Sequence, residues 1–136
     1  MRSLFLDTNV VVYAFDRADP TKQRLALQVL EASDRLVVST QVLLETWWVL
    51  TRRLAEPLDE SQAREVIDQL CTLPVVSTDP QLVLQAIETG RHSGIAIRDA
   101  LIIEAARVAG CHRLLSEDLH SGQDFDGVVI ENPFET

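Results

Sequence analysis

"LFLDTN", residues 4–9, is a short apolar run that stops on an aspartate, a threonine and an asparagine. The apolar part is typical of a buried strand. Asp7, Thr8 and Asn9 are also good helix-capping residues, because their short side chains accept hydrogen bonds from the free N–H groups of a following helix. The alternative is chemical, since a carboxylate at the carboxyl end of a parallel strand lies where α/β proteins bind their ligands. The rest of the sequence has to decide between the two roles.

Short β-like segments alternate with longer helical ones along the chain, which is typical of a wound α/β domain. The length of 136 residues and the hydrophobic content of 46% suffice for one core, so we expect a single domain over residues 1–136. The long intervals suit crossovers between parallel strands. Helix-start signals stand at Asp19-Pro20, Pro57-Leu58-Asp59 and Thr78-Asp79-Pro80, and Gly110 marks the end of a helix from Ile97. We expect strands near 4–6, 36–39, 75–77, 113–115 and 128–130, with helices in the intervals between them.

The composition excludes several classes of protein. The longest plain apolar run, Val10 to Phe15, is far shorter than the roughly 18 residues of a membrane span, and Asp7 interrupts the first apolar stretch too early for a secretory signal. We therefore expect a cytoplasmic protein with no membrane partner. Cys71 and Cys111 form no metal-binding or disulfide pattern with each other or with the histidines, so we expect two buried free thiols.

The charge is strongly acidic, with 21 Asp and Glu against 12 Lys and Arg and a net charge of −9. This balance argues against nucleic-acid binding through a simple basic patch, and a polyanionic substrate would need help from cations. Lys22 is the only lysine. Haloacid-dehalogenase-like phosphotransferases and response-regulator receivers both need a lysine further along the chain, so both classes are disfavoured. A serine hydrolase is disfavoured because the sequence has no G-x-S-x-G motif.

Acidic and hydroxyl side chains follow three of the predicted strands. Asp7-Thr8-Asn9 follows the first strand, Ser39-Thr40 follows the second and leads into a helix that carries Glu45, and Ser116-Glu117-Asp118 follows the fourth. Parallel strands bring their carboxyl ends to one edge of the sheet, so we expect these side chains to lie close together.

Asp99 opens a further helix, on whose helical wheel it shares an apolar flank with Ile102, Ile103 and Ala106. An unpaired carboxylate would be costly to bury there, so something must stabilise it. The helix macrodipole and the free N–H groups of the first turn could do so. A bound cation would satisfy the carboxylate equally well.

Glu45 is open to two interpretations. On its helical wheel it lies with Gln41 and Arg52 in a narrow polar sector, which favours a solvated glutamate. Trp48 and Val49 follow it at three and four residues and place apolar bulk beside the carboxylate, which favours a crevice instead.

Four segments, spread over nearly the whole chain, resemble the PIN-domain nucleases and in particular the bacterial VapC-type toxin ribonucleases: "FLDTNVVVYAF", "STQVLLETWWVL", "IRDALIIEAARVAG" and "RLLSEDL". In that family an aspartate ends the first strand, a glutamate lies on an early helix, an aspartate heads a later helix, and another acid follows the fourth strand after a Ser or Thr. Asp7, Glu45, Asp99 and Asp118 match these positions. The resemblance implies a PIN-like three-layer α/β/α domain with a central parallel sheet of four to five strands.

The resemblance also implies a Mg²⁺- or Mn²⁺-dependent endoribonuclease, acting as the toxin of a type II toxin–antitoxin pair. Carboxylates brought together without a cation repel one another, and both ions prefer hard oxygen ligands, so the four acids make sense as a metal site. We assign Asp7 and Asp99 as principal ligands. Glu45 and Asp118 would bind through water, complete the shell of a second ion or orient the attacking water.

Other residues have supporting roles by the same resemblance. Thr8, Asn9 and Ser116 would position the ligands. Glu117 and Asp124 are candidates to share the duty of the fourth acid. Arg98 is a candidate phosphate contact, and a solvated arginine at a helix start is the alternative.

The expected partners are an RNA substrate, a second copy of the chain in a homodimer, and a small antitoxin. The net charge of −9 favours a basic inhibitory segment in that antitoxin, because it would steer positive peptides toward the protein. The competing interpretation is a catalytically silent PIN-like binding or scaffold module, against which the presence of all four acids argues.

Overall fold

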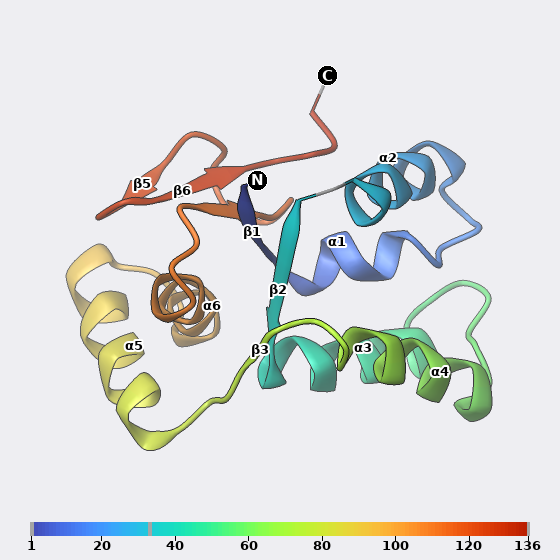
Figure 1. Cartoon of the computed structure of the whole chain (residues 1–136), viewed down its shortest axis with the longest axis horizontal. Coiled ribbons are helices and arrows are strands. Elements are labelled where there is room, and N and C mark those ends of the chain that lie inside the picture. The colour runs from blue at the N-terminus through green and yellow to red at the C-terminus, as the bar shows by residue number, and fades with distance from the viewer. Residues whose placement is uncertain (1, 33, 136) are drawn as a thin grey trace.

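The computed structural model describes residues 2–32 and 34–135 and has one twisted six-stranded sheet (Figure 1). The strand order is β3-β2-β1-β4-β6-β5. All neighbouring strands are parallel except β5 and β6, which are antiparallel. The strands are β1 (Ser3–Leu6), β2 (Arg35–Ser39), β3 (Val75–Val76), β4 (Arg113–Leu115), β5 (Asp124–Phe125) and β6 (Val128–Glu131).

Helices cover both faces of the sheet, as the expected three-layer architecture requires. Figure 1 shows α5 and α6 on one side of the central strands and α1 to α4 on the other. The helices are α1 (Thr8–Tyr13), α2 (Pro20–Glu31), α3 (Thr40–Arg52), α4 (Glu60–Leu70), α5 (Pro80–Ser93) and α6 (Ile97–Val108).

The central strands explain why both faces must be covered. Leu4, Phe5 and Leu6 are successive residues of β1 and are all buried, although neighbouring side chains in a strand point to opposite faces. Val37 and Val38 repeat this pattern in β2. A continuous apolar strand of this kind is typical of a parallel sheet between two helical layers. The first residues of the chain therefore fix β1 at the centre, and Asp7 at its carboxyl end.

The predicted helix-start signals are confirmed. The side chains of Asp19, Asp59 and Asp79 cap α2, α4 and α5 by accepting a hydrogen bond from the N–H of the third residue of each helix. At α4 the side chain of Gln62 also accepts a hydrogen bond from the backbone N–H of Asp59, which completes a capping box. Gly110, with a φ of 74°, lies just beyond the end of α6. Its left-handed conformation suits glycine at a helix end.

The five predicted strands are present, with ends shifted by no more than one residue, but the interval between β4 and β6 differs from the prediction. In the described chain this interval holds a loop and the short strand β5 instead of a helix. Asp126 and Gly127 connect β5 to β6, and both have positive φ. An Asp-Gly pair is a strong signal for a tight hairpin, so the sequence contained the information for this strand.

Two further expectations concern the cysteines and membrane-spanning helices. Both cysteines are free, but only Cys111 is buried, so the expectation of a buried thiol is wrong for the exposed Cys71. Within residues 2–32 and 34–135, none of the helices combines the length and the apolar character needed to cross a membrane.

The capping box of α4 gives a stability prediction. Asp59→Ala should lower the free energy of unfolding by about 1 kcal/mol, because it leaves N–H groups of the first turn without their partner. In a domain of this size that loss corresponds to a melting temperature lower by roughly 3–5 °C. Asp59→Asn is the control, since asparagine caps a helix about as well as aspartate. Equal melting temperatures for Asp59→Ala and the unchanged chain would contradict the assignment.

Candidate active site

Asp7 lies at the carboxyl edge of the sheet, directly after β1. Its backbone N–H donates to the carbonyl of Leu115 at the end of β4, 3.0 Å away. Its side chain is fully buried and accepts hydrogen bonds from the N–H of Thr8 at 2.8 Å and from the hydroxyl of Ser116 at 2.8 Å. Asp7 therefore caps α1 and also presents a buried carboxylate between two parallel strands. The capping role suggested by "LFLDTN" is confirmed, and the carboxylate also lies at the edge of the sheet where α/β proteins bind their ligands.

Glu45 faces this edge from α3. The helix starts immediately after β2, where the buried side chain of Ser39 caps it by accepting from the N–H of Val42. One turn later, Glu45 accepts a hydrogen bond at 2.9 Å from the hydroxyl of Thr8. Its side chain is only 30% exposed. The structure thus supports the crevice interpretation and not that of a solvated glutamate.

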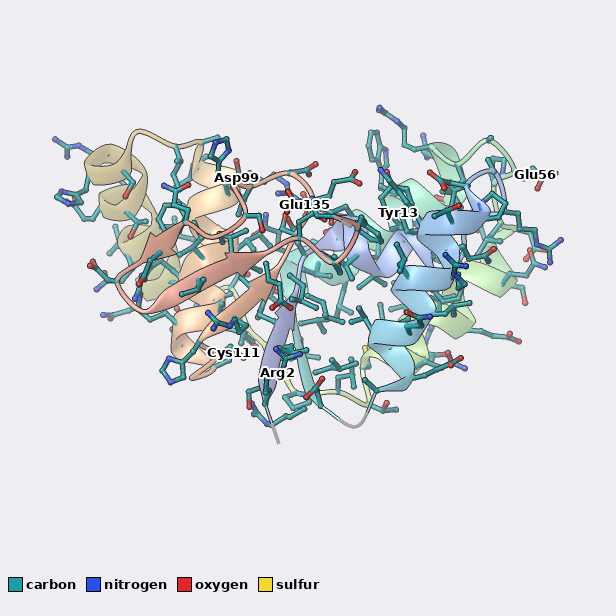
Figure 2. All side chains as sticks on the ribbon, turned by 90° about the horizontal axis from the view of Figure 1, so that it is seen from above. Arg2, Tyr13, Glu56, Asp99, Cys111 and Glu135 are labelled. Carbon is teal, nitrogen blue, oxygen red and sulfur yellow. The ribbon has the colours of Figure 1, made fainter. Side chains whose placement is uncertain are left out.

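Asp99 comes from the other helical layer, as the third residue of α6. Figure 2 shows it at the opposite end of the sheet from Arg2 and Cys111, which precede β1 and β4. Among the described residues, no side chain caps the first turn of α6, so Asp99 is not a hydrogen-bonded helix cap. Its carboxylate accepts from the Nη1 of Arg98 at 3.0 Å. A cation therefore satisfies it, in addition to the helix macrodipole.

Arg98 connects the three carboxylates. Its Nη2 donates to Asp7 Oδ1 at 3.1 Å and to Glu45 Oε1 at 3.0 Å, and its Nε donates to Glu45 Oε2 at 2.8 Å. Its Nη1 donates to Asp99 Oδ1 at 3.0 Å. The carbonyl of Arg98 accepts from the Nε2 of Gln41 at 3.3 Å, which ties the start of α6 to α3. The sequence suggests a phosphate contact or a solvated arginine at position 98, and in the structure Arg98 is the centre of an ion-pair cluster.

Asp118 is linked to Asp7 through the side chain of Asn9. The Nδ2 of Asn9 donates to Asp118 Oδ2 at 3.2 Å, to the Ser116 hydroxyl at 3.4 Å and to Asp7 Oδ2 at 3.5 Å. Its Oδ1 accepts from the N–H of Glu117 at 3.1 Å. One asparagine after β1 therefore holds the loop after β4 against the first acid. The four acids of the sequence pattern form one connected group, which we call the acidic site.

Glu117 points to other partners. Its carboxylate accepts a hydrogen bond from the Tyr13 hydroxyl at 3.0 Å and is paired with Lys22. The ammonium of Lys22 also lies 4.8 Å from the ring centroid of Tyr13 and 5.7 Å from that of Phe134. Sequence reasoning noted Lys22 as the only lysine but missed that it and Tyr13 hold the loop of residues 116–118. The structure thus gives Glu117 a positioning contact and not a place among the four acids.

Asp124 lies away from the acidic site. It is in β5, where it pairs with Val129 at the level of Arg113, the first residue of β4. Its side chain accepts from the N–H of Gly127 at 2.7 Å within the hairpin. The structure therefore does not bring this candidate additional acid to the other carboxylates, because the unpredicted β5 carries it to the sheet edge.

Burial dominates the electrostatics of Asp7. The loss of solvent raises the pKa of its carboxyl group above the ordinary value, and the charge of Arg98, the Ser116 hydroxyl and the Thr8 N–H oppose that rise. Burial lowers the pKa of the Arg98 guanidinium, but Asp7 and Glu45 outweigh this effect, so that the pKa lies above its ordinary value. The site is therefore built around a permanent positive charge.

The donor set fits a divalent metal ion. The acidic site offers hard carboxylate oxygens, which Mg²⁺ and Mn²⁺ prefer, and its buried carboxylate already needs a cation beside it. Within the described residues, no three acidic, histidine or cysteine side chains stand close enough to hold a metal as they lie. Arg98 occupies the space between the carboxylates of Asp7, Glu45 and Asp99.

The fold and the site define a class of protein: a wound α/β domain with acids gathered at the carboxyl edge of its parallel strands. The family model of the PIN domain matches residues 4–122, and the chain belongs to this family. No curated protein matches the chain.

Several solved structures share the fold. A toxin–antitoxin complex from Klebsiella pneumoniae is 18% identical, with 98% of this chain and 99% of that chain covered and a TM-score of 0.72. VapC20 of Mycobacterium tuberculosis, a sarcin-ricin loop cleaving toxin, is 21% identical over 82% of this chain and 86% of its own, with a TM-score of 0.65. DNA-bound VapBC from Salmonella typhimurium is 19% identical, with coverages of 98% and 99% and a TM-score of 0.66. These likenesses confirm the expected PIN-like fold.

Tyr13 reports on the contact that holds the 116–118 loop. Burial and the carboxylate of Glu117 raise the pKa of its phenol, while Lys22 lowers it. We expect Glu117→Gln to bring that pKa down toward the ordinary value, because the phenolate would no longer face a negative charge. Tyr13 is the only tyrosine, so a pH titration of tyrosinate absorbance reads this group alone. Glu56→Gln, an exposed acid elsewhere, should leave the titration unchanged. An unchanged titration in Glu117→Gln would refute the contact.

Proposed function

We propose that this chain is a Mg²⁺- or Mn²⁺-dependent endoribonuclease that hydrolyses RNA phosphodiester bonds at the acidic site, with residues 1–136 acting as a single nuclease domain. The observation that carries the proposal is the convergence of Asp7, Glu45 and Asp99 on one guanidinium. These acids come from the end of β1, from α3 and from α6, on both sides of the sheet. Membership of the PIN family supports the same chemistry.

The residues present would divide the work as follows. A divalent ion bound at the acidic site would lower the pKa of a water molecule and offset the charge that develops on the scissile phosphate. Asp7 and Asp99 would hold the ion, and Asp7 is the more rigid of the two because Ser116 and the Thr8 N–H fix its carboxylate. Glu45, whose side chain is 30% exposed, and the exposed Asp118 would orient the attacking water and accept its proton. The ribose oxygen would leave as the water oxygen bonds to phosphorus.

Thr8, Asn9 and Ser116 would position these acids without touching the substrate. Each of them donates a hydrogen bond to one of the four carboxylates. Groups that orient the ligands of a metal site are worth about 10–100-fold in affinity or activity. This network explains why hydroxyl and amide residues accompany the acids in the sequence.

The surface of the protein has a hollow beside the acidic site, where part of the substrate would bind. It encloses about 300 Å³ next to Glu45. Two leucines, Leu44 and Leu101, supply apolar surface to it, and Leu44 is 73% exposed. We propose that a nucleotide next to the scissile phosphate lies over this hollow, where apolar side chains can contact the face of a base. The hollow is lined by Thr40, Gln41, Leu44, Glu45, Thr78 and Leu101.

We also propose that the nuclease is the toxin of a type II toxin–antitoxin pair, acts in the cytoplasm and forms a homodimer. The support is the likeness in fold to a toxin–antitoxin complex and to VapBC. With a net charge of −9, the chain would attract a basic inhibitory segment of its antitoxin more readily than an acidic one. A growth arrest on expression that a co-encoded small protein relieves would support this role.

The acidic site gives a direct prediction for activity. Asp7→Asn and Asp99→Asn should each reduce Mg²⁺-dependent RNA cleavage by more than about 100-fold, because a direct ligand is worth more than an outer partner. Glu45→Gln and Asp118→Asn should reduce it less. Cleavage of a labelled RNA by the purified variants measures the effect, and circular dichroism checks that they fold. Asp124→Asn makes the same chemical change outside the acidic site and should keep full activity.

Two results would contradict the proposed function. Full cleavage by the Asp7→Asn and Asp99→Asn variants would reject the acidic site as the catalytic centre. If the unchanged chain cuts no RNA with Mg²⁺ or Mn²⁺ but binds a partner protein tightly, the family member is a binding or scaffold module instead.

A further inference from the structure

We propose that Arg98 is an internal cation that competes with the divalent metal, so that metal binding requires its guanidinium to leave the acidic site. The inference rests on the proposed metal-dependent function and adds a residue that controls metal affinity. It concerns the metal-free chain and the step that precedes catalysis.

The hydrogen bonds of Arg98 carry the argument. Nε, Nη1 and Nη2 each donate to a carboxylate, at distances between 2.8 and 3.1 Å. They use one oxygen of Asp7, one of Asp99 and both oxygens of Glu45. The oxygens of Asp7 and Asp99 in this set belong to the two carboxylates that would hold the metal. The guanidinium therefore binds directly to the proposed ligands and does not merely lie near them.

Asp7 has no spare oxygen for an additional ion. Its Oδ1 accepts from Thr8 N–H and Arg98, its Oδ2 accepts from Ser116 and, at 3.5 Å, from Asn9, and the side chain has no exposed surface. A metal cannot reach this carboxylate unless one of these donors moves. Thr8 N–H belongs to the backbone of α1, and Ser116 is buried directly after β4. The amide of Asn9 is held from its other side by the N–H of Glu117, so the donor that can leave is Arg98.

Arg98 has a way out. Its side chain is 36% exposed, so one side of it faces solvent. Its backbone is held by the hydrogen bond from Gln41 to its carbonyl and by the first turn of α6, so the side chain can rotate without unwinding the helix. Once outside, a guanidinium next to Asp99 stands at the rim of the acidic site. There it can contact a phosphate oxygen of the RNA, the role the sequence suggested for it.

Competition of this kind has a thermodynamic signature. If Arg98 occupies the acidic site in most molecules, the apparent dissociation constant of the metal is the intrinsic constant divided by the fraction of molecules in which the site is free. Removing the guanidinium should remove this penalty. It should also destabilise the metal-free chain, because the carboxylates then repel one another without a cation.

Isothermal titration of Mg²⁺ into the unchanged chain and into Arg98→Met is the test. We expect the dissociation constant to fall at least about tenfold in Arg98→Met, which corresponds to about 1.4 kcal/mol. In chelator the melting temperature of Arg98→Met should lie below that of the unchanged chain, and saturating Mg²⁺ should raise it by the larger amount.

Arg98→Lys is the matched control for charge. A lysine keeps the positive charge but cannot donate to three carboxylates in the fixed plane of a guanidinium. We therefore expect Arg98→Lys to bind Mg²⁺ more tightly than the unchanged chain and less tightly than Arg98→Met. If Arg98→Lys binds like the unchanged chain while Arg98→Met gains affinity, the effect is one of charge alone, and displacement from the acidic site is refuted.

Nuclear magnetic resonance provides a readout on the unchanged chain, which needs no substitution to fold. The Nε–H signal of Arg98 is identified by its loss in Arg98→Lys. In the metal-free chain it should show the slow solvent exchange of a hydrogen-bonded group, and Mg²⁺ should accelerate that exchange. A signal that stays protected at saturating Mg²⁺ would overturn the inference.

The outcomes separate this inference from the proposed function. If Mg²⁺ binds and RNA is cut, but Arg98→Met has an unchanged dissociation constant, Arg98 is not a competitor and the nuclease assignment stands. If neither protein binds Mg²⁺ and neither cuts RNA, the proposed function fails and the inference fails with it.

Discussion

The buried carboxylate of Asp7 is the constraint on which the rest of the site depends. It stands between the ends of β1 and β4 with no exposed surface, where an unpaired charge would be strongly unfavourable. The structure compensates with a backbone N–H, a serine hydroxyl and the guanidinium of Arg98. Because Arg98 belongs to α6 and also binds Glu45 of α3, stabilising one aspartate ties the two helical layers together across the sheet.

A second group of contacts sets where the fourth acid lies. The short loop after β4 leads to β5 and not into a helix. Its position comes from Asn9 on one side and from the pairing of Glu117 with Lys22 and Tyr13 on the other. Asp118 is thereby kept beside Asp7 although it is on a loop. Under the proposed function, a chain with a net charge of −9 would meet RNA through cations placed individually at the acids and not through a basic surface.

The sequence predicted which acids lie together, but it did not predict the partners of Arg98 or the hairpin after β4. The carboxyl-edge rule predicted that Asp7, Glu45 and Asp118 would lie together, since it depends only on strand direction. The ion pairs of Arg98 with Asp7 and Glu45 were not predicted, because these partners lie on other elements of the fold, far from Arg98 in the sequence. The hairpin that carries Asp124 away from the site was missed, although the Asp-Gly pair at its turn was visible in the sequence.

The sequence by itself determined the order of strands and helices as far as β4, the caps at Asp19, Asp59 and Asp79, and the edge of the sheet where the acids gather. These follow from local patterns, since a strand of continuous apolar residues must be covered on both faces and an aspartate before a helix caps it. Only the tertiary structure decided which charges are paired. Arg98 and Glu45 are 53 positions apart, and Lys22 and Glu117 are 95 apart, so no local rule relates them. Their pairing follows from the packing of α3 and α6 about the central strands and of the 116–118 loop against α1 and α2, which brings distant charges within hydrogen-bond distance.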